Sequence, residues 1–139
     1  DTLAYNAVDR TEVLRQAEPI TARSLAMVMA GIRTGDLELV GKGATLSALA
    51  HQRVLPKPAL PAAMAAGRKL GAAGVVVGHS GTIIGLLFPP GTRQRTNIQD
   101  CIRTYVSGVS ILGWCSTCGG GVQHSHKSGK PWERALARA

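Results

Sequence analysis

The chain has 139 residues, of which 45% are hydrophobic and 17% are charged, a composition typical of one globular domain and unlike that of a disordered protein. No apolar run approaches the length of about 18 residues that a membrane helix needs, and an odd number of cysteines, three, favours a reducing compartment such as the cytoplasm. The net charge of +8 is scattered along the chain, which argues against nucleic acid as its partner.

The first half of the chain has the apolar spacing of helices. One helix is expected after Asp9, and Pro19 is expected to separate it from a second one, because proline fits the first turn of a helix better than its interior. The apolar residues expected to face inward in these two segments are Val13, Leu14, Ala17, Leu25, Val28, Met29 and Ile32.

Two further helices are expected on either side of a stiff connector, Leu55-Pro56-Lys57-Pro58. Asp36 is a suitable N-cap for the first of them, which ends near His51-Gln52. Its inward residues are expected to be Leu37, Val40, Ala44, Ala48 and Leu49. The second spans about Ala59–Leu70, and Gly71 or Gly74 supplies the left-handed residue that ends it.

The second half begins with two apolar runs, Val75–Val77 and Ile83–Phe88, that are typical of buried strands. Asn97 is expected to cap a last helix, and Val109–Trp114 to form a last strand; Thr2–Tyr5 has the weak alternation of a strand end. Strands joined by a short turn pair antiparallel. The order of elements therefore predicts an α+β domain with helices packed on one face of a small antiparallel sheet.

The segment between the two strands, Gly78-His79-Ser80-Gly81-Thr82, is the first candidate site. The N–H groups of Ser80 and Gly81 can bind a phosphate or carboxylate, with His79 and the Ser80 hydroxyl as further donors. The alternative is a hairpin turn that needs glycine only for a positive φ. The surplus of nearby glycines, at 71, 74, 78, 81 and 85, favours the binding site.

A second candidate is a zinc site formed by Cys115, Cys118, His124 and His126. The histidines lie two residues apart and the cysteine–histidine interval is short, a spacing that matches no common zinc finger. A glycine-rich tail with a reducible thiol pair is the favoured alternative. No Gly-x-Ser-x-Gly elbow is present, and the few acidic residues lie where caps and helix surfaces are expected, so no catalytic residue is assigned in this chain.

The glycine-rich stretch resembles the third motif of the GHMP kinases, which include galactokinase, homoserine kinase and mevalonate kinase. That motif is Gly-Ala-x-Gly, a strand, a Ser/Gly-rich loop ending Ser-Gly-Pro, and a second strand. This chain has Gly71-Ala72-x-Gly74, Val75–Val77 and the Gly78–Thr82 loop. His79 replaces a usual glycine and Thr82 a usual proline. A His-Ser-Gly-Thr loop followed by Gly-Leu-Leu-Phe is similar to the L-threonine kinase branch of cobalamin synthesis and propanediol utilisation.

The resemblance implies a C-terminal kinase domain of the ferredoxin-like, two-layer type over residues 1–121, followed by a basic tail over 122–139. It implies transfer of the γ-phosphoryl group of ATP, with Mg²⁺, to the hydroxyl of L-threonine, and Gly78–Thr82 as one wall of that site. Nothing here matches the family's phosphate loop, Pro-x-x-x-Gly-Leu-x-Ser-Ser. An N-terminal half is therefore the expected partner, and this half alone is expected to be inactive and to bind no cofactor.

Two other classes of function stay open at the level of sequence. One is a non-catalytic regulatory module that binds a small anion through the Gly78–Thr82 loop. The other is a zinc-stabilised nucleic-acid binder that uses the basic tail. Elemental analysis for zinc separates the second from a kinase domain, and calorimetry with threonine, phosphothreonine and nucleotides separates the first.

Overall fold

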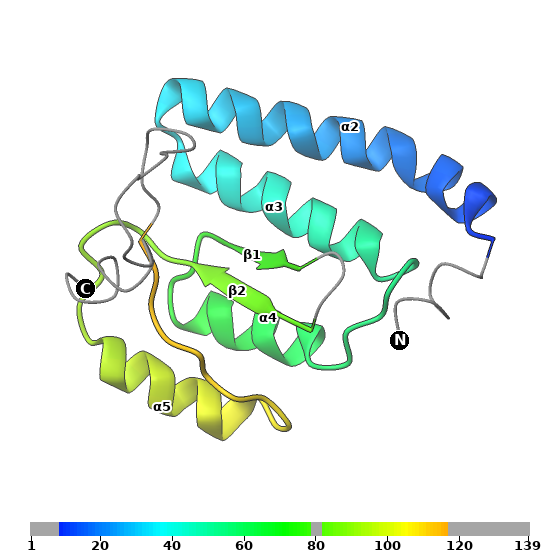
Figure 1. Cartoon of the computed structure of the whole chain (residues 1–139). Coiled ribbons are helices and arrows are strands. Elements are labelled where there is room, and N and C mark those ends of the chain that lie inside the picture. Colours follow the sequence, from blue (N-terminus) through cyan, green and yellow to red (C-terminus); the bar gives the residue numbers. More distant parts are fainter. Residues whose placement is uncertain (1–8, 79–81, 117–139) are drawn as a thin grey trace, which may run out of the picture. The chain divides into compact units, whose positions relative to one another are not determined.

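The computed structural model of the chain describes residues 9–78 and 82–116, which contain four helices and two strands (Figure 1). In chain order they are α2 (Thr11–Thr34), α3 (Leu37–His51), α4 (Leu60–Lys69), β1 (Gly74–Val77), β2 (Ile84–Leu87) and α5 (Arg95–Tyr105). These elements belong to one compact unit that extends to Val109. A second unit starts at Ser110, and its described residues, 110–116, contain no helix or strand.

Helix α2 is continuous through Pro19, so the expected break into two helices is wrong. Pro19 is exposed to solvent, where the distortion caused by its missing N–H is tolerated. The helix pairs antiparallel with α3, and the Ser24 hydroxyl donates a buried hydrogen bond of 2.8 Å to the carbonyl of Gly43. Packing of α2 against α3 after the proline therefore helps to hold the helix together, which local propensity alone does not predict.

The face of α2 that packs on α3 agrees with the expectation only in part, since Ala17 is buried as expected but most of the large apolar residues are not. Its buried residues are small, namely Ala17, Ser24 and Gly31. A Cβ atom at Gly43 of α3 would lie 2.9 Å from the Ser24 carbonyl oxygen, so the two helices approach too closely for large side chains between them. The larger apolar residues instead face solvent, with exposed fractions of 54% for Leu14, 61% for Leu25, 45% for Met29 and 64% for Ile32.

Strands β1 and β2 form an antiparallel hairpin in which Gly74 pairs with Leu87 and Val77 with Ile84. Helix α3 covers the free edge of β1. There the backbone N–H of Val75 donates a 3.0 Å hydrogen bond to Oγ1 of Thr45, which replaces the missing neighbouring strand. Gly41 of α3 and Gly74 of β1 touch through their backbones. The edge of the hairpin is therefore closed by a helix rather than exposed.

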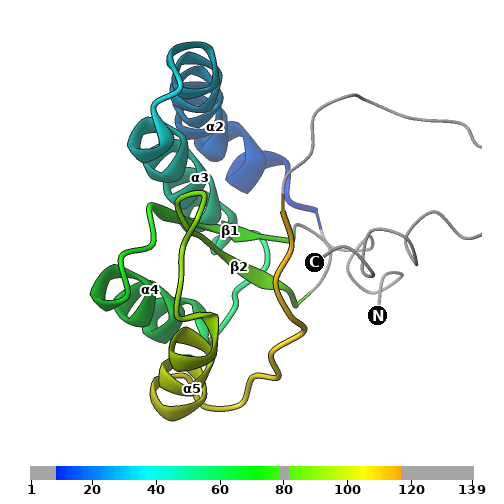
Figure 2. The ribbon, with the colours of Figure 1, turned by 90° about the vertical axis from the view of Figure 1, so that its left-hand side faces the viewer.

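Helix α4 lies across one face of the hairpin, and α5 packs outside α4 (Figure 2). Ala48, Leu60 and Val75 form the first core cluster, with Val77 and Met64 packed against it. Ala63, Ala66 and Val106 form a second cluster between α4 and α5. Val76, which points to the opposite face of the hairpin, is 37% exposed. The predicted α+β arrangement, with helices on one face of a small antiparallel sheet, is thus confirmed.

The predicted helix ends and strands have mixed outcomes. Asp36 caps α3 as expected, since its carboxylate accepts a 2.9 Å hydrogen bond from the backbone N–H of Leu39. Asn97 is not the cap of α5, which begins at Arg95 after Gln94. Val109–Trp114 is not a strand, since the sheet among the described residues contains only β1 and β2. The expected strand end at Thr2–Tyr5 lies outside the described residues.

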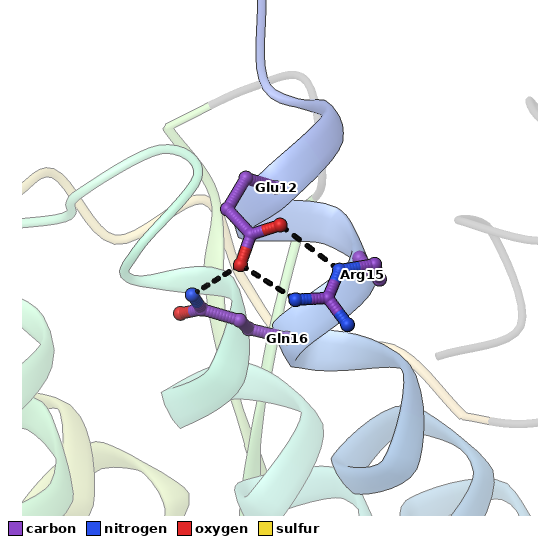
Figure 3. Close-up of polar contacts among 3 residues, drawn as sticks. All are labelled: Glu12, Arg15 and Gln16. Carbon is purple, nitrogen blue, oxygen red and sulfur yellow. Dashed lines mark hydrogen bonds and ion pairs between the residues drawn. The ribbon is translucent and has the colours of Figure 1, made fainter.

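In the first turn of α2 the carboxylate of Glu12 is hydrogen-bonded to two neighbouring side chains, Arg15 and Gln16 (Figure 3). It makes a contribution to stability that depends on pH. The carboxylate of Glu12 accepts hydrogen bonds from Nε and Nη2 of Arg15 at 2.9 and 2.8 Å and from Gln16 at 2.7 Å. The Arg15 contacts, and then the Gln16 contact, lower the pKa of Glu12 below its usual range. The carboxylate therefore ionises more readily in the folded state than in the unfolded state. These hydrogen bonds contribute fully to stability at pH values above the unfolded pKa of about 4.3.

Glu12→Gln is therefore expected to cost a small amount of stability at pH 7, and the difference from the wild type should vanish as the pH falls through the folded pKa. Urea unfolding at pH 7 and pH 3 measures both ends of that range. Glu18→Gln is the matched control, because Glu18 has no hydrogen bond or ion pair among the described residues. A Glu12→Gln effect that persists unchanged at pH 3 would contradict the prediction.

Candidate functional site

The candidate loop closes the hairpin at the carboxyl end of β1. The backbone N–H of Gly78 donates a 2.9 Å hydrogen bond to the carbonyl of Ile83, which extends the β1–β2 ladder by one step. Gly78 is half-buried and Thr82 is exposed. His79, Ser80 and Gly81 lie outside the described residues, so anion binding by their N–H and hydroxyl groups stays a prediction.

Three of the five glycines around the loop have structural reasons of their own. Gly71 ends α4 with φ of +78°, a left-handed conformation that side chains disfavour. Gly74 permits the backbone contact with Gly41, and a Cβ at Gly85 would lie 2.7 Å from Cγ2 of Val76 across the hairpin. The number of glycines near the loop is therefore weaker evidence for ligand binding than the sequence alone indicates. Only Gly78 and Gly81 still support a binding site.

The α3–α4 connector, residues 52–59, lies at the same end of the hairpin as the loop. Helix α3 runs in the direction of β1, because Gly41 contacts Gly74 at the start of the strand and Thr45 bonds Val75 further along. Helix α4 returns through a tight turn to the start of β1, so its amino end lies beside the end of that strand. Figure 1 shows the connector on the side of the hairpin where β1 ends and β2 begins.

Lys57, in this connector, is a candidate that the motif analysis missed. Its side chain is 6% exposed, and its Nζ atom is buried with no hydrogen-bond partner among the described residues. Buried lysines are otherwise almost always paired. The sequence offered one signal for it, a lysine held between Pro56 and Pro58, but only the tertiary structure reveals that the side chain is buried.

The proposed zinc ligands are mostly outside the described part of the chain. Cys115 is exposed and its thiol is free, whereas Cys118, His124 and His126 are not among the described residues. Within residues 9–78 and 82–116, no group of three or more His, Cys, Asp or Glu side chains is placed to hold a metal ion. Mg²⁺ prefers oxygen ligands and usually binds through carboxylates and substrate phosphates. The described residues thus supply no carboxylate set that could hold this metal.

A cavity of about 340 Å³ lies away from this end, beside the start of β1. Its lining is mainly apolar and comes from α3, α4 and residues 72–75, with the basic side chains of Lys42 and Arg68 among the lining residues. It does not include Gly78, Thr82 or Lys57. The hollow and the candidate loop are therefore separate features of the fold.

The sequence that forms this fold matches a known class of protein. The sequence model described as "GHMP kinases C terminal" matches residues 28–106, which is more than half of the chain and includes the whole hairpin. The chain therefore belongs to the family of GHMP kinase C-terminal domains.

Within that class, the chain is similar to two curated L-threonine kinases. The enzyme of Salmonella typhimurium is 30% identical over 97 residues, which cover 70% of this chain and 31% of that protein. The enzyme of Citrobacter freundii is 31% identical over 87 residues, covering 63% of this chain and 30% of that protein. The chain thus spans about three tenths of the length of these relatives. No solved structure matches it.

No helix among the described residues combines the length and the apolar character that crossing a membrane requires.

Proposed function

We propose that this chain is the C-terminal domain of a cytoplasmic kinase that transfers the γ-phosphoryl group of ATP to the hydroxyl of L-threonine, giving O-phospho-L-threonine. The observation that carries the proposal is the similarity to two L-threonine kinases, together with the family match across the hairpin. The His-Ser-Gly-Thr loop supports the same branch of the family.

The Gly78–Thr82 loop is proposed to form one wall of the active site. Phosphoryl transfer needs little covalent chemistry from a protein and depends on positioning and on neutralising the charge of the phosphate oxygens. Backbone N–H groups of a glycine-containing loop can approach those oxygens closely. Mg²⁺, bound with ATP in the complete kinase, would supply most of the charge neutralisation, and its protein ligands would come from outside the described residues.

The proposed partner is the N-terminal part of such a kinase, because the chain covers only about three tenths of its relatives. The surface of α2 supports a covering partner. Leu14, Leu25, Met29 and Ile32 recur at helical spacing along one side and are all largely exposed. Exposed apolar residues gathered on one side of a helix mark an interaction face more often than a free surface. Alone, the chain is expected to have no kinase activity.

A chimera tests the proposed function directly. The part of the Salmonella typhimurium L-threonine kinase that aligns with this chain is replaced by the chain, and formation of O-phospho-L-threonine from ATP is measured. We expect activity in the chimera, none in the isolated chain, and a preference for L-threonine over L-serine and L-homoserine. A folded chimera that binds an unrelated small effector but phosphorylates none of these acceptors would instead favour the regulatory module.

The loop itself is tested in the same chimera with bulky replacements. Ser80→Leu and Gly81→Leu are each expected to lower kcat/KM by about 100-fold or more, because they obstruct the N–H donors and the approach of the phosphate. Ser107→Leu is the matched control, since Ser107 is exposed and lies after α5. Full turnover by the Ser80 and Gly81 variants would show that the loop is not part of the active site.

A further inference from the structure

We propose that the ammonium group of Lys57 is an anion-binding group of the kinase site, which pairs with the anionic oxygens of a phosphate or a carboxylate of the substrates. The identity of these anions rests on the proposed function, whereas the binding of an anion by Lys57 does not. The loop analysis and the family match assign no role to this residue.

The burial of Lys57 without a partner is the first observation behind the proposal. Its side chain is 6% exposed, and Nζ has no hydrogen-bond acceptor among the described residues. An ammonium group removed from water loses its hydration, a large cost unless a counter-charge or acceptors replace the water. In the unliganded protein this desolvation energy is uncompensated. A bound anion would compensate it by supplying the missing counter-charge.

The described acidic side chains do not supply that counter-charge. Glu12, Glu38 and Asp100 form ion pairs with Arg15, Lys42 and Arg103 on their own helices. The others are Asp36, which caps α3, Asp9, which accepts from the N–H of Thr11, and Glu18, which is exposed on α2. None of them forms an ion pair with Lys57. With no counter-charge among the described residues, a bound anionic ligand is the counter-charge that we propose.

The backbone around Lys57 is held firmly in place. Its N–H donates a 2.7 Å hydrogen bond to Oε1 of Gln52, and its carbonyl accepts one of 3.0 Å from the N–H of Leu60. Pro56 and Pro58 restrict the chain on either side. Such a segment fixes the origin of the side chain before a ligand arrives, which lowers the entropy cost of binding.

The position of the connector links Lys57 to the active-site wall. Residues 52–59 lie at the carboxyl end of β1, where Gly78 and Thr82 flank the candidate loop (Figure 1). The amino end of α4 starts three residues after Lys57, and its N-cap residue, Ala59, makes no side-chain capping bond. The positive end of that helix adds to the attraction for an anion. The charged side chain of Lys57 and the amino end of α4 thus belong to the same short segment, which ends at the core residue Leu60.

Thermal unfolding of the full 139-residue chain tests anion binding without any need for activity. Sodium phosphate is titrated at constant ionic strength, with sodium chloride as the balance, for the wild type, Lys57→Met and Lys42→Met. We expect the midpoint of the wild type to rise with phosphate and that of Lys42→Met, an exposed lysine of α3, to rise equally. Lys57→Met is expected to lose this rise and to be more stable than the wild type without phosphate, because it no longer buries an unpaired charge.

The same variants in the chimeric kinase identify the anion. Lys57→Met is expected to lower kcat/KM by about 100-fold, with Lys57→Arg recovering part of it. If Lys57→Met raises only the KM for ATP, the anion that Lys57 binds is a phosphate of ATP. If it raises only the KM for L-threonine, and not that for L-threoninamide, the anion is the carboxylate of L-threonine. An undiminished phosphate response in Lys57→Met would overturn the proposal, as would a lower midpoint without phosphate, which would place the counter-charge within the chain.

The two experiments separate the failure of this inference from that of the proposed function. A phosphate response that depends on Lys57 in a chain whose chimera does not phosphorylate L-threonine would keep the anion site and reject the kinase substrate. An active chimera that is indifferent to Lys57→Met would keep the kinase and reject the role of Lys57.

Discussion

Gly41→Ala is expected to lower the free energy of unfolding by about 4 kcal/mol or more, a loss that leaves a domain of this size largely unfolded. A Cβ atom at Gly41 would overlap the carbonyl group of Ala73 and would lie 2.9 Å from the backbone nitrogen of Gly74. All of these are backbone atoms, which cannot turn aside as the end of a side chain can. The substitution therefore forces α3 away from β1.

Moving α3 has consequences beyond the overlap itself. The hydrogen bond from Val75 to Thr45 would stretch, and Ala48, which is fully buried, would leave the core cluster that it forms with Leu60 and Val75. A buried strand N–H without an acceptor adds to the cost. Gly74→Ala is expected to be similarly damaging, because its Cβ would meet the backbone of Gly41 from the other side.

Gly67→Ala, in α4, is the matched control for these substitutions. The nearest atom to its Cβ would be Cδ2 of Leu86 at 3.1 Å, the movable end of a side chain, and alanine also gains about 1 kcal/mol of helix propensity. Its stability should stay close to that of the wild type. Urea denaturation followed by circular dichroism measures all three variants. Equal stability of Gly41→Ala and Gly67→Ala would show that α3 and β1 do not meet as described.

Leu60→Ala is the second large effect, with an expected loss of about 3 kcal/mol. Leu60 is the largest side chain that is fully buried among the described residues, with an exposed fraction of 1%. It joins α4 to Ala48 of α3 and Val75 of β1, and Met64, Val77, Ile84 and Leu86 pack against this cluster. Its removal leaves a cavity that a backbone held by close glycine contacts cannot collapse to fill.

Leu25→Ala is the control for Leu60→Ala, because it makes the same chemical change at a side chain that is 61% exposed. In the isolated chain we expect a change within about 0.5 kcal/mol. The same substitution in the chimeric kinase should cost more if the N-terminal part covers α2, since the side chain then becomes buried. Comparable losses from Leu60→Ala and Leu25→Ala in the isolated chain would contradict the assignment of the core to the α4 face.

Much of the secondary structure could be predicted from local patterns. Asp36 capped its helix, the helix starting there ended at His51, and Gly71 ended α4 with a positive φ, because caps and left-handed glycines depend on a few neighbouring residues. The two strands were found within a residue of their ends. Pro19 was misjudged because its local preference is opposed by the packing of α2 on α3.

The inward faces were harder to predict than the elements. Hydrophobic spacing correctly assigned Ala17 of α2 to the core. It also assigned Leu25, Met29 and Ile32, which are exposed, and missed Ser24 and Gly31, which are buried. Small residues permit close helix approach, and that preference is invisible to a pattern that rewards large apolar side chains. The large residues on α2 are exposed and form the interface proposed above rather than a core.

For the candidate site, the sequence by itself determined the family. It also predicted the Gly78–Thr82 loop, whose role stays a prediction, because the loop lies in a motif of consecutive residues. It could not determine which glycines serve the fold, because the contact of Gly74 with Gly41 joins residues 33 positions apart. It also could not reveal Lys57, whose significance is its burial without a partner. Both depend on packing between α3, α4 and β1, which only the tertiary structure decides, because burial and close backbone approach are properties of distant segments brought together.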